Sequence, residues 1–382
     1  MPQPPAVSGS RPLASATTSA TPNATTSTMP NATASATTSP AASATTHATP
    51  GHAPSPNRLL DVANAAGVSL RTASRVLNDD PRVASVTRQR VREVMLDLSF
   101  QPDAMARSLR AGTDTAIGFV VESISDPFFA DVIDAVELEM SKHGRAVLVA
   151  STRREASREH DVVGRMFARR VAGLLLSPTA ETHSWLAHQS APVVLVDRPA
   201  PGLSADLVEI DDRQAAFDAV SHLIAYGHRR IAYVGDTPAI PTSAARLRGY
   251  RDALAAHQIA ADEELVRCDG ATTQAAANAA AALINSSRPP TAILSATTRA
   301  SFGVVPALHA GRRTDIALVA FGDFPMADSL RPAITVVDHP GHEVGRVAAA
   351  RLLARLAAPE LPVERIQVPA RIIARGSGEL TP

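Results

Sequence analysis

From residue 115 onward, short apolar runs alternate with stretches of helical periodicity, and this alternation constrains the fold more than any other feature of the sequence. The helical stretches include residues 128–144, 215–228 and 244–258. The apolar runs suit buried parallel strands, and they read TAIGFVVE, RAVLVAS, VAGLLLSP, APVVLVDR, RIAYVGD, TAILSAT and DIALVAFGD. Repeated β-α units over about 260 residues predict doubly wound α/β sheets, and this length is enough for two of them. Ligands of such folds bind beyond the carboxyl ends of the strands, which places a ligand site in the cleft between two facing lobes.

The first 56 residues have a different composition, with Ser, Thr, Ala, Pro and Asn in loose repetition and Arg11 as the only formally charged side chain. Large apolar residues are almost absent, so burial cannot offset the entropy of ordering this segment. We therefore expect residues 1–56 to form a disordered tail.

From residue 57 the pattern changes to dense helical periodicity. Gly67 breaks the first apolar stripe and allows a tight turn, and Ser85 is placed to cap the third helix. The stripes predict three short helices, and their members are Leu59, Leu60, Val62, Ala63 and Ala66, then Ala73, Val76 and Leu77, then Val91, Val94, Met95 and Leu98. This arrangement is typical of a helix-turn-helix module.

The second of these helices carries Arg71, Arg75 and Asn78 at spacings i, i+4 and i+7, on a face turned away from its apolar stripe. Arg and Asn are the side chains that read guanine and adenine edges in the major groove, although they are also common on solvated helices. The whole chain has no net charge, with 37 basic and 37 acidic residues. Between Arg58 and Arg110, however, nine Arg and six acidic residues give a net charge of +3. Basic charge is therefore concentrated around the helices, as a DNA-binding head requires.

A further short helix is predicted in QPDAMARSLRAGT, where Pro102 opens it, Asp103 can cap it and Gly112 ends it. It is about two turns long, so we expect it to form only against a partner.

Several classes of function have no signal in this sequence. Cys268 is the single cysteine, which excludes an internal disulfide and a cysteine-based zinc site. His339 and His342 share a metal-like spacing without a nearby cluster of ligands, and we expect them at the surface or at a lobe crossing. Asp211 and Asp212 begin a helix, where acidic residues favour the dipole, and a catalytic pair there is disfavoured.

The usual catalytic motifs are also missing: there is no GxGxxG after a strand, no Walker A run, no GxSxG elbow and no HExxH. We therefore expect no catalytic residue, no metal site and no cofactor. The sequence has no apolar run of about 20 residues and no signal-peptide pattern, so we expect a cytoplasmic protein without a membrane partner.

The order of these parts resembles the LacI/GalR family of transcriptional regulators over roughly residues 58 to 378. The segments similar to family motifs are DVANAAGVSLRTASRVLNDDPRVASVTRQRV in the head, QPDAMARSLRAG in the hinge, and IGFVVESISDPFFADVIDAVE, RRVAGLLLSP, PVVLVDRP, YGHRRIAYVGD, RLRGYRDAL and VPARIIARGSG in the body. The resemblance implies an all-α helix-turn-helix head and a hinge helix, followed by an α/β body with two periplasmic-binding-protein-like lobes of parallel sheets flanked by helices. The expected boundaries are 57–101 for the head, 102–112 for the hinge, 113–199 with 340–358 for the N-lobe, and 200–339 with 359–378 for the C-lobe.

The resemblance also implies a homodimer, or a tetramer, that places two recognition helices in successive major grooves of a pseudo-palindromic operator. By position, Leu70 and Arg71 would select bases, and Arg75 would read an operator base pair. The positions that would contact the DNA backbone or orient the helix are Ser69, Thr72, Ser74 and Asn78. In the hinge, Leu109 matches the leucine wedge that the family inserts into the minor groove, with Ala106 and Arg107 beside it.

For the cleft, the resemblance implies an effector site, and its residues here would be Asp126, Phe128, Phe129, Asp197, Arg198, Arg246 and Asp323. Aromatic faces and buried Arg suit a sugar or sugar derivative, although Phe128 and Phe129 could instead pack in the core. The cleft also departs from the family pattern. Thr297 and Thr298 replace an Asn-Asp pair, and Gly322 stands where an aspartate that commonly binds the ligand is expected.

These observations predict a DNA-binding transcriptional regulator, expected to act as a repressor, whose operator affinity changes when a small molecule binds between the lobes. Two alternatives are less favoured. A sugar-binding receptor that does not bind DNA would leave residues 58–112 without a role, and an α/β enzyme would need a catalytic motif that the sequence lacks.

Overall fold

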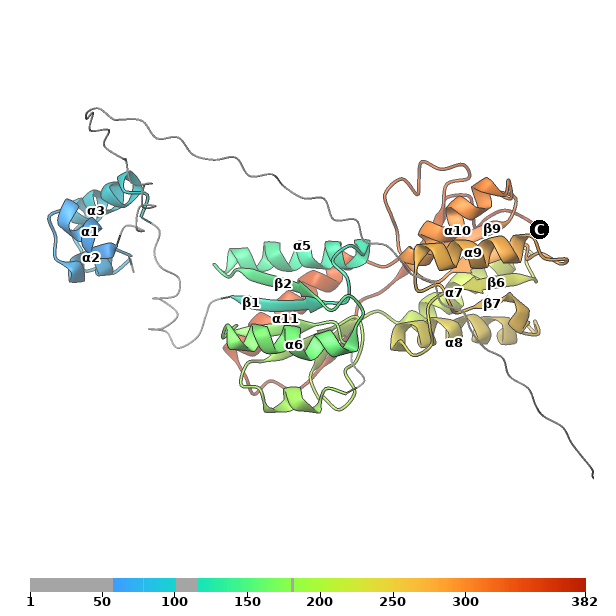
Figure 1. Ribbon diagram of the computed structural model, residues 1–382, viewed down its shortest axis with the longest axis horizontal. Coiled ribbons are helices and arrows are strands. Elements are labelled where there is room, and N and C mark those ends of the chain that lie inside the picture. The colour runs from blue at the N-terminus through green and yellow to red at the C-terminus, as the bar shows by residue number, and fades with distance from the viewer. Residues whose placement is uncertain (1–57, 78, 101–115, 180–181) are drawn as a thin grey trace, which may run out of the picture. The chain divides into compact units, whose positions relative to one another are not determined.

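The computed structural model describes residues 58–77, 79–100, 116–179 and 182–382 (Figure 1). The chain divides into two compact units, of which the first ends at Ser99 and the second begins at Phe100.

The first unit contains the three expected helices, α1 (Leu59–Ala65), α2 (Leu70–Leu77) and α3 (Ser85–Asp97). Gly67 adopts φ +63° directly after α1, which a glycine tolerates without strain, and the chain turns there into α2. Val62, Ala73 and Val91, one from each helix, are fully buried and form the centre of this small core. Two details differ from the expectation. Ser85 is the first residue of α3 and does not cap it, and Leu60 is 49% exposed.

The described residues of the second unit form two six-stranded sheets. The first sheet has the order β11-β5-β4-β3-β1-β2, and all its neighbouring strands are parallel. Its strands are β1 (Ile117–Val121), β2 (Val147–Ser151), β3 (Gly173–Leu176), β4 (Val193–Val196), β5 (Asp206–Glu209) and β11 (Arg365–Gln367). Helices α5 (Pro127–Lys142) and α11 (Gly341–Ala357) pack together on one face, and α6 (Ala156–Ala168) covers the other, with the short helix η1 (Ser184–His188) near it.

The second sheet has the order β12-β10-β9-β8-β6-β7, with β12 antiparallel to β10 at its edge. Its strands are β6 (Ile231–Val234), β7 (Val266–Arg267), β8 (Ala292–Ser295), β9 (Ala317–Phe321), β10 (Thr335–Asp338) and β12 (Arg371–Ile373). Helices α7 (Asp212–Ala225) and α8 (Pro241–Ala256) pack on one face. Helices α9 (Thr273–Ile284) and α10 (Thr298–Ala310) pack on the other, and η2 (Glu263–Leu265) precedes β7. We call the first sheet with its helices the first lobe, and the second sheet with its helices the second lobe.

The lobes exchange chain segments at positions that differ from the expected boundaries. Strand β5 pairs with β4, so the chain leaves the first lobe after Glu209 and not at residue 200. Strand β11 pairs with β5, so residues 365–367 belong to the first lobe and not to the second. The reason lies in Asp206, which is 1% exposed and accepts hydrogen bonds from Arg351 and Arg355 of α11. This buried charge cluster fixes β5 beside a helix that is remote in sequence.

None of the described helices is long and apolar enough to cross a membrane. Within the described ranges, no group of three or more His, Cys, Asp and Glu side chains is arranged to hold a metal ion.

Candidate functional site

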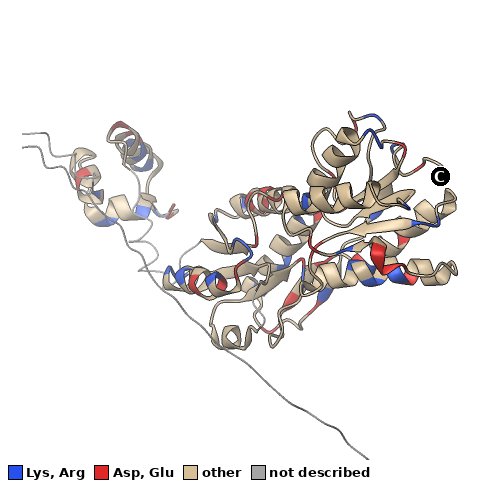
Figure 2. Cartoon of the chain, turned by 45° about the vertical axis from the view of Figure 1, so that its right-hand side comes forward, with Lys and Arg blue, Asp and Glu red and all other residues tan. Residues whose placement is uncertain are grey.

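Helix α2 of the head presents a polar face to solvent. Ala73 and Val76 are buried, whereas Leu70 is 48% exposed and Arg71 is exposed. In Figure 2, basic positions recur along the helices of the head. The core side of α2 is therefore apolar, and the side chains expected to select bases project away from it.

The predicted helix-orienting residues have a local role that the structure makes visible. Ser69 caps α2, because its Oγ accepts a hydrogen bond from the Thr72 backbone N–H at 3.1 Å. Its hydroxyl also lies 2.9 Å from Thr72 Oγ1. Ser74 is half-buried on the same helix. Four other predicted DNA-contacting residues lie outside the described residues, and these are Asn78, Ala106, Arg107 and Leu109.

Arg75 has an acidic neighbour that sequence reasoning did not connect with it. Its Nε lies 3.7 Å from Asp80 Oδ2, and its side chain remains 41% exposed. The same carboxylate accepts hydrogen bonds from Arg82 Nε at 2.9 Å and Nη2 at 2.8 Å. These contacts, with Arg82 the largest contributor, lower the pKa of Asp80 to about 2. Asp80 is therefore ionised at neutral pH and holds two arginines at the end of α2.

In the body, side chains from both lobes line a partly open cavity at the carboxyl ends of the strands, with a volume of about 50 Å³. Of the seven residues predicted for the effector site, six line this cavity, and these are Asp126, Phe128, Phe129, Asp197, Arg198 and Arg246. The structure thus brings together side chains from the start of α5, from the segment after β4 and from α8, which are remote in sequence.

Asp323, the seventh, does not line this cavity. It lines an adjoining pocket beside Gly322 and His342. Its carboxylate accepts hydrogen bonds from Arg375 at 2.8 and 2.5 Å, and this pairing lowers its pKa. Arg375 thus contacts both oxygens of Asp323, whose side chain stays 40% exposed.

Two buried arginines determine the electrostatics of the cavity. Arg198 lies between Asp197 and Glu122, with Nη2 at 2.7 Å from the first carboxylate and 2.9 Å from the second. Burial opposes the charge on Arg198, but the two carboxylates outweigh burial and raise its pKa above the usual range. The Arg198 charge is therefore permanent, and Glu122 is tied to it.

The second buried arginine, Arg246, belongs to α8. Its Nε donates to Asp212 at 2.6 Å, its Nη1 donates to the Ala296 carbonyl at 2.9 Å, and its guanidinium lies 3.9 Å from the ring centroid of Phe321. Burial raises the pKa of Asp212, although the facing Arg246 opposes this shift. Asp211, the preceding residue, caps α7 by accepting from the Gln214 N–H at 3.0 Å. The two aspartates thus have separate structural roles.

An aromatic wall completes the cavity. The ring of His339 stacks on Phe128 with centroids 3.7 Å apart and an angle of 10° between the planes. Phe129 meets Phe128 edge-on at 5.1 Å. Burial lowers the pKa of His339 well below its usual value, and the nearby Arg246 and Arg198 lower it further. A neutral imidazole therefore stacks on Phe128.

Sequence reasoning missed several residues of the cavity, namely Glu122, Asp236, Thr242, Ser243, Arg299, Phe321 and His339. Thr297 and Thr298, which the sequence already placed in the cleft, also line it. Most of them share one signal, since they follow a predicted strand or begin the next helix. In a doubly wound sheet these positions meet at the carboxyl edge.

Comparisons with known proteins identify the family. Residues 58–103 match the model described as bacterial regulatory proteins, lacI family, and residues 220–378 match a periplasmic binding protein-like domain. The HTH-type transcriptional regulator GalR of Salmonella typhimurium is 33% identical over 287 residues, which cover 73% of this chain and 84% of GalR. The chain belongs to the LacI family. It is accordingly a DNA-binding transcriptional regulator that responds to a ligand, as the sequence predicted.

Solved structures of related proteins agree with this assignment. A putative ribose operon repressor from Burkholderia thailandensis is 29% identical, with a TM-score of 0.62 over 68% of this chain and 98% of that one. The transcriptional regulator CelR, solved as a complex with cellobiose, is 27% identical, with a TM-score of 0.62 over 84% of this chain and 99% of that one. The helix-turn-helix head and the two-lobed α/β body of this LacI-family chain confirm the fold class expected from its sequence.

Proposed function

We propose that this chain is a repressor that binds a pseudo-palindromic operator as a homodimer, and that a sugar or sugar derivative bound in the cleft sets its affinity for the operator. The cleft binds its ligand without transforming it. The relatives named above are regulators, and two of their solved structures carry the name of a sugar or a sugar operon.

The proposal of a sugar or sugar derivative as the ligand rests on the mixture of groups around the cavity. Four carboxylates and three guanidinium groups line it together with aromatic rings. Arg299 Nη2 lies 3.7 Å from Asp126 Oδ2 and 3.9 Å from Glu122 Oε1. A hydroxyl group placed between them could accept from the guanidinium and donate to a carboxylate. The hydrogen-bonding groups of such a site match a ligand that is rich in hydroxyls and carries no strong charge.

The charge balance argues against a strongly anionic effector. Asp126 has a raised pKa because burial and the nearby Glu122 both disfavour its ionised form, while Arg299 opposes the shift. An added anion would increase the negative charge beside these two acids. A neutral polyol adds none and offers a flat apolar ring face to Phe128.

For the head, the proposal assigns base reading to Leu70, Arg71 and Arg75, whose exposure on α2 suits entry into a major groove. The proposal assigns contacts with the DNA backbone, or the orientation of the helix, to Ser69, Thr72, Ser74 and Asn78. The proposed minor-groove contacts of the hinge, Ala106, Arg107 and Leu109, complete the interface.

A thermal-shift screen of the full chain with neutral sugars, nucleosides and sugar phosphates tests the ligand class. We expect a neutral sugar to raise the Tm and to change binding to an operator selected from random DNA in a gel shift. Asp126→Asn should weaken this response, whereas Asp134→Asn on the exposed side of the same helix should not. A response to sugar phosphates alone would contradict the ligand class, and the lack of DNA binding at low salt would contradict the regulator.

A further inference from the structure

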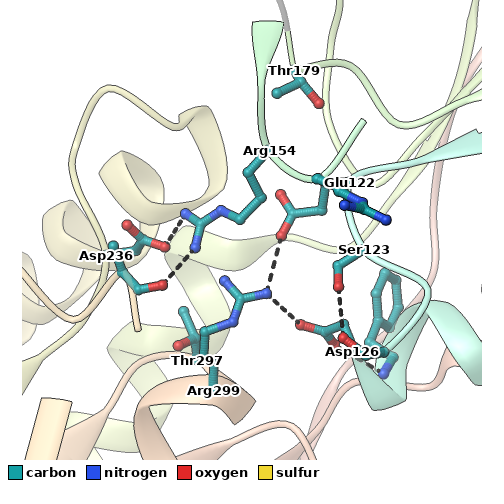
Figure 3. Close-up of polar contacts among 12 residues, drawn as sticks. Glu122, Ser123, Asp126, Arg154, Thr179, Asp236, Thr297 and Arg299 are labelled. Atoms are coloured by element: carbon teal, nitrogen blue, oxygen red, sulfur yellow. Dashed lines mark hydrogen bonds and ion pairs between the residues drawn. The ribbon is translucent and has the colours of Figure 1, made fainter. Parts of the chain in front are cut away.

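Two arginines bridge the lobes at the cleft, and neither was singled out in the sequence. Arg154 follows β2 of the first lobe and pairs with Asp236, which follows β6 of the second lobe (Figure 3). Its Nη1 also donates to the Ala271 carbonyl of the second lobe at 3.0 Å. The side chains of Arg154 and Asp236 are 22% and 5% exposed. This pair is therefore largely removed from water, where charges interact more strongly.

Arg299 crosses the cleft in the opposite direction. It lies in the first turn of α10 in the second lobe, and its guanidinium points between Glu122 and Asp126 of the first lobe (Figure 3). Glu122 is held in place by Arg198, at 2.9 Å, and Asp126 is held by capping α5. The acceptors on the first lobe are thus fixed, and separating the lobes would leave them without Arg299.

The space behind these bridges is small. About 50 Å³ remains among the lining side chains, whereas pockets for small ligands usually measure about 300–1,000 Å³. A sugar ring does not fit into this volume. The lobes must move apart before such a ligand can enter, and this movement separates Arg154 from Asp236 and Arg299 from its two acids.

We propose that Arg154 and Arg299 form an electrostatic latch, which holds the lobes closed over a space too small for an effector, so that the effector binds only the form in which both bridges are broken. The latch concerns the protein before ligand binding and therefore goes beyond the proposed function. The free energy needed to break both bridges weakens the apparent affinity of every ligand, because this affinity falls with the population of the open form. Hydroxyl groups that replace the broken bridges would recover part of this cost.

The experiment measures opening of the cleft without any effector, through the alkylation rate of a thiol placed inside it. Ser243 lines the cavity and is 3% exposed, and serine to cysteine is a small change of shape. The reporter is Ser243→Cys in the full chain with Cys268→Ser, so that it carries the only thiol. The rate constant for iodoacetamide labelling then follows the fraction of open molecules.

We expect Arg154→Gln and Arg299→Gln each to raise the labelling rate about fivefold, the effect of one partly buried ion pair. Arg154→Gln combined with Asp236→Asn should label no faster than Arg154→Gln alone, because both changes break the same bridge. The matched control is Arg213→Gln, which removes an arginine paired with Asp252 at 2.6 Å within the second lobe, and its rate should equal that of the reporter.

Unchanged labelling in both single variants, at unchanged Tm, would overturn the latch. So would equal acceleration by Arg213→Gln, because the effect would then be one of general charge. If Arg154→Gln or Arg299→Gln does not fold, Asp236→Asn, which breaks the first bridge from the other lobe, decides in its place, and an unchanged labelling rate in Asp236→Asn refutes the proposal. The assay contains no sugar and no DNA, so its outcome does not depend on whether the proposed function is correct.

Discussion

The hydroxyl of Thr298 occupies the space into which any side chain at residue 322 would project. A Cβ built on Gly322 would lie 2.3 Å from Thr298 Oγ1, well inside van der Waals contact, and Gly322 has φ +87°. The same hydroxyl donates to the Phe321 carbonyl at 3.4 Å. The side chains at these two positions are therefore sterically coupled in this chain. An aspartate at residue 322 would therefore have to displace the side chain of Thr298.

This relationship predicts the outcome of restoring a side chain. Gly322→Ala should lower the free energy of unfolding by about 1–3 kcal/mol, because it adds a steric clash to backbone strain. Thr298→Ala combined with Gly322→Ala should recover part of that loss, leaving the contribution of the positive φ. Urea denaturation monitored by circular dichroism measures both. Gly164→Ala, on α6 with nothing within 4 Å of the added methyl, is the control and should not destabilise. Simple additivity of the two substitutions would show that they are not coupled.

The buried pair of Asp212 and Arg246 gives a second prediction. Their side chains are 6% and 8% exposed and lie 2.6 Å apart. Asp212→Ala should destabilise the body by about 3–5 kcal/mol, because it leaves the Arg246 charge buried without its partner. Asp252→Ala removes the acid of an exposed pair, with Arg213 61% exposed, and should cost less than about 1 kcal/mol. Equal losses in urea denaturation would mean that Arg246 finds another acceptor.

Much of the fold could be predicted because its signals are local. Each of the seven apolar runs in the body became a strand, and the three stripes of the head became helices. The strands that were missed are short or carry charge, as in the sequence DLVE of β5. Asp206 is buried there only because Arg351 and Arg355 reach it from α11, about 145 residues later in the chain. No local pattern contains that contact.

The residues of the cleft also divide into those that the sequence could place and those that depend on contacts remote in sequence. Residues at strand ends, such as Asp126 and Arg198, could be placed from the resemblance and the topology. Arg154 and Arg299 could not, because each acquires its role from a carboxylate in the opposite lobe. His339 had been expected at the surface or a lobe crossing, and it lies between β10 and α11, but its stacking on Phe128 depends on tertiary structure alone. The pairing of Asp323 with Arg375 could not be predicted either, because Arg375 comes from the C-terminal segment.

The buried His339 predicts a dependence of stability on pH. Its pKa is lowered in the folded protein, so below the usual value of 6.5 the unfolded chain binds a proton that the folded chain excludes. Stability should therefore fall as the pH drops below about 6.5, with a contribution approaching 1.4 kcal/mol per pH unit. His339→Gln should reduce this slope between pH 7 and 5 in urea denaturation. His342→Gln, three residues away and 64% exposed, should leave it unchanged. Identical slopes in wild type and His339→Gln would contradict a neutral, buried imidazole.

The head predicts a separation between selectivity and affinity. If Arg71 and Arg75 read bases, replacing either by Ala should lower discrimination between the selected operator and a one-base variant by about 1–3 kcal/mol. Nonspecific binding should change little, because it depends on contacts with phosphates. Arg92 is the control, since it lies on α3 and pairs with Asp79 at 2.5 Å. Arg92→Ala should not change the ratio of the two affinities, even if it weakens both.

Asp80 refines this test, because its carboxylate lies 3.7 Å from Arg75 and is bound to Arg82. Asp80→Asn removes the charge that restrains both arginines, so it should lower discrimination less than Arg75→Ala does and strengthen nonspecific binding at low salt. Fluorescence anisotropy with the selected operator, its one-base variant and random DNA, each at two salt concentrations, measures all three affinities. Unchanged discrimination between operator and one-base variant in Arg75→Ala would show that Arg75 does not read a base. The exposed Leu70 and Arg71 would then be the only described side chains of α2 to which the proposal assigns that role.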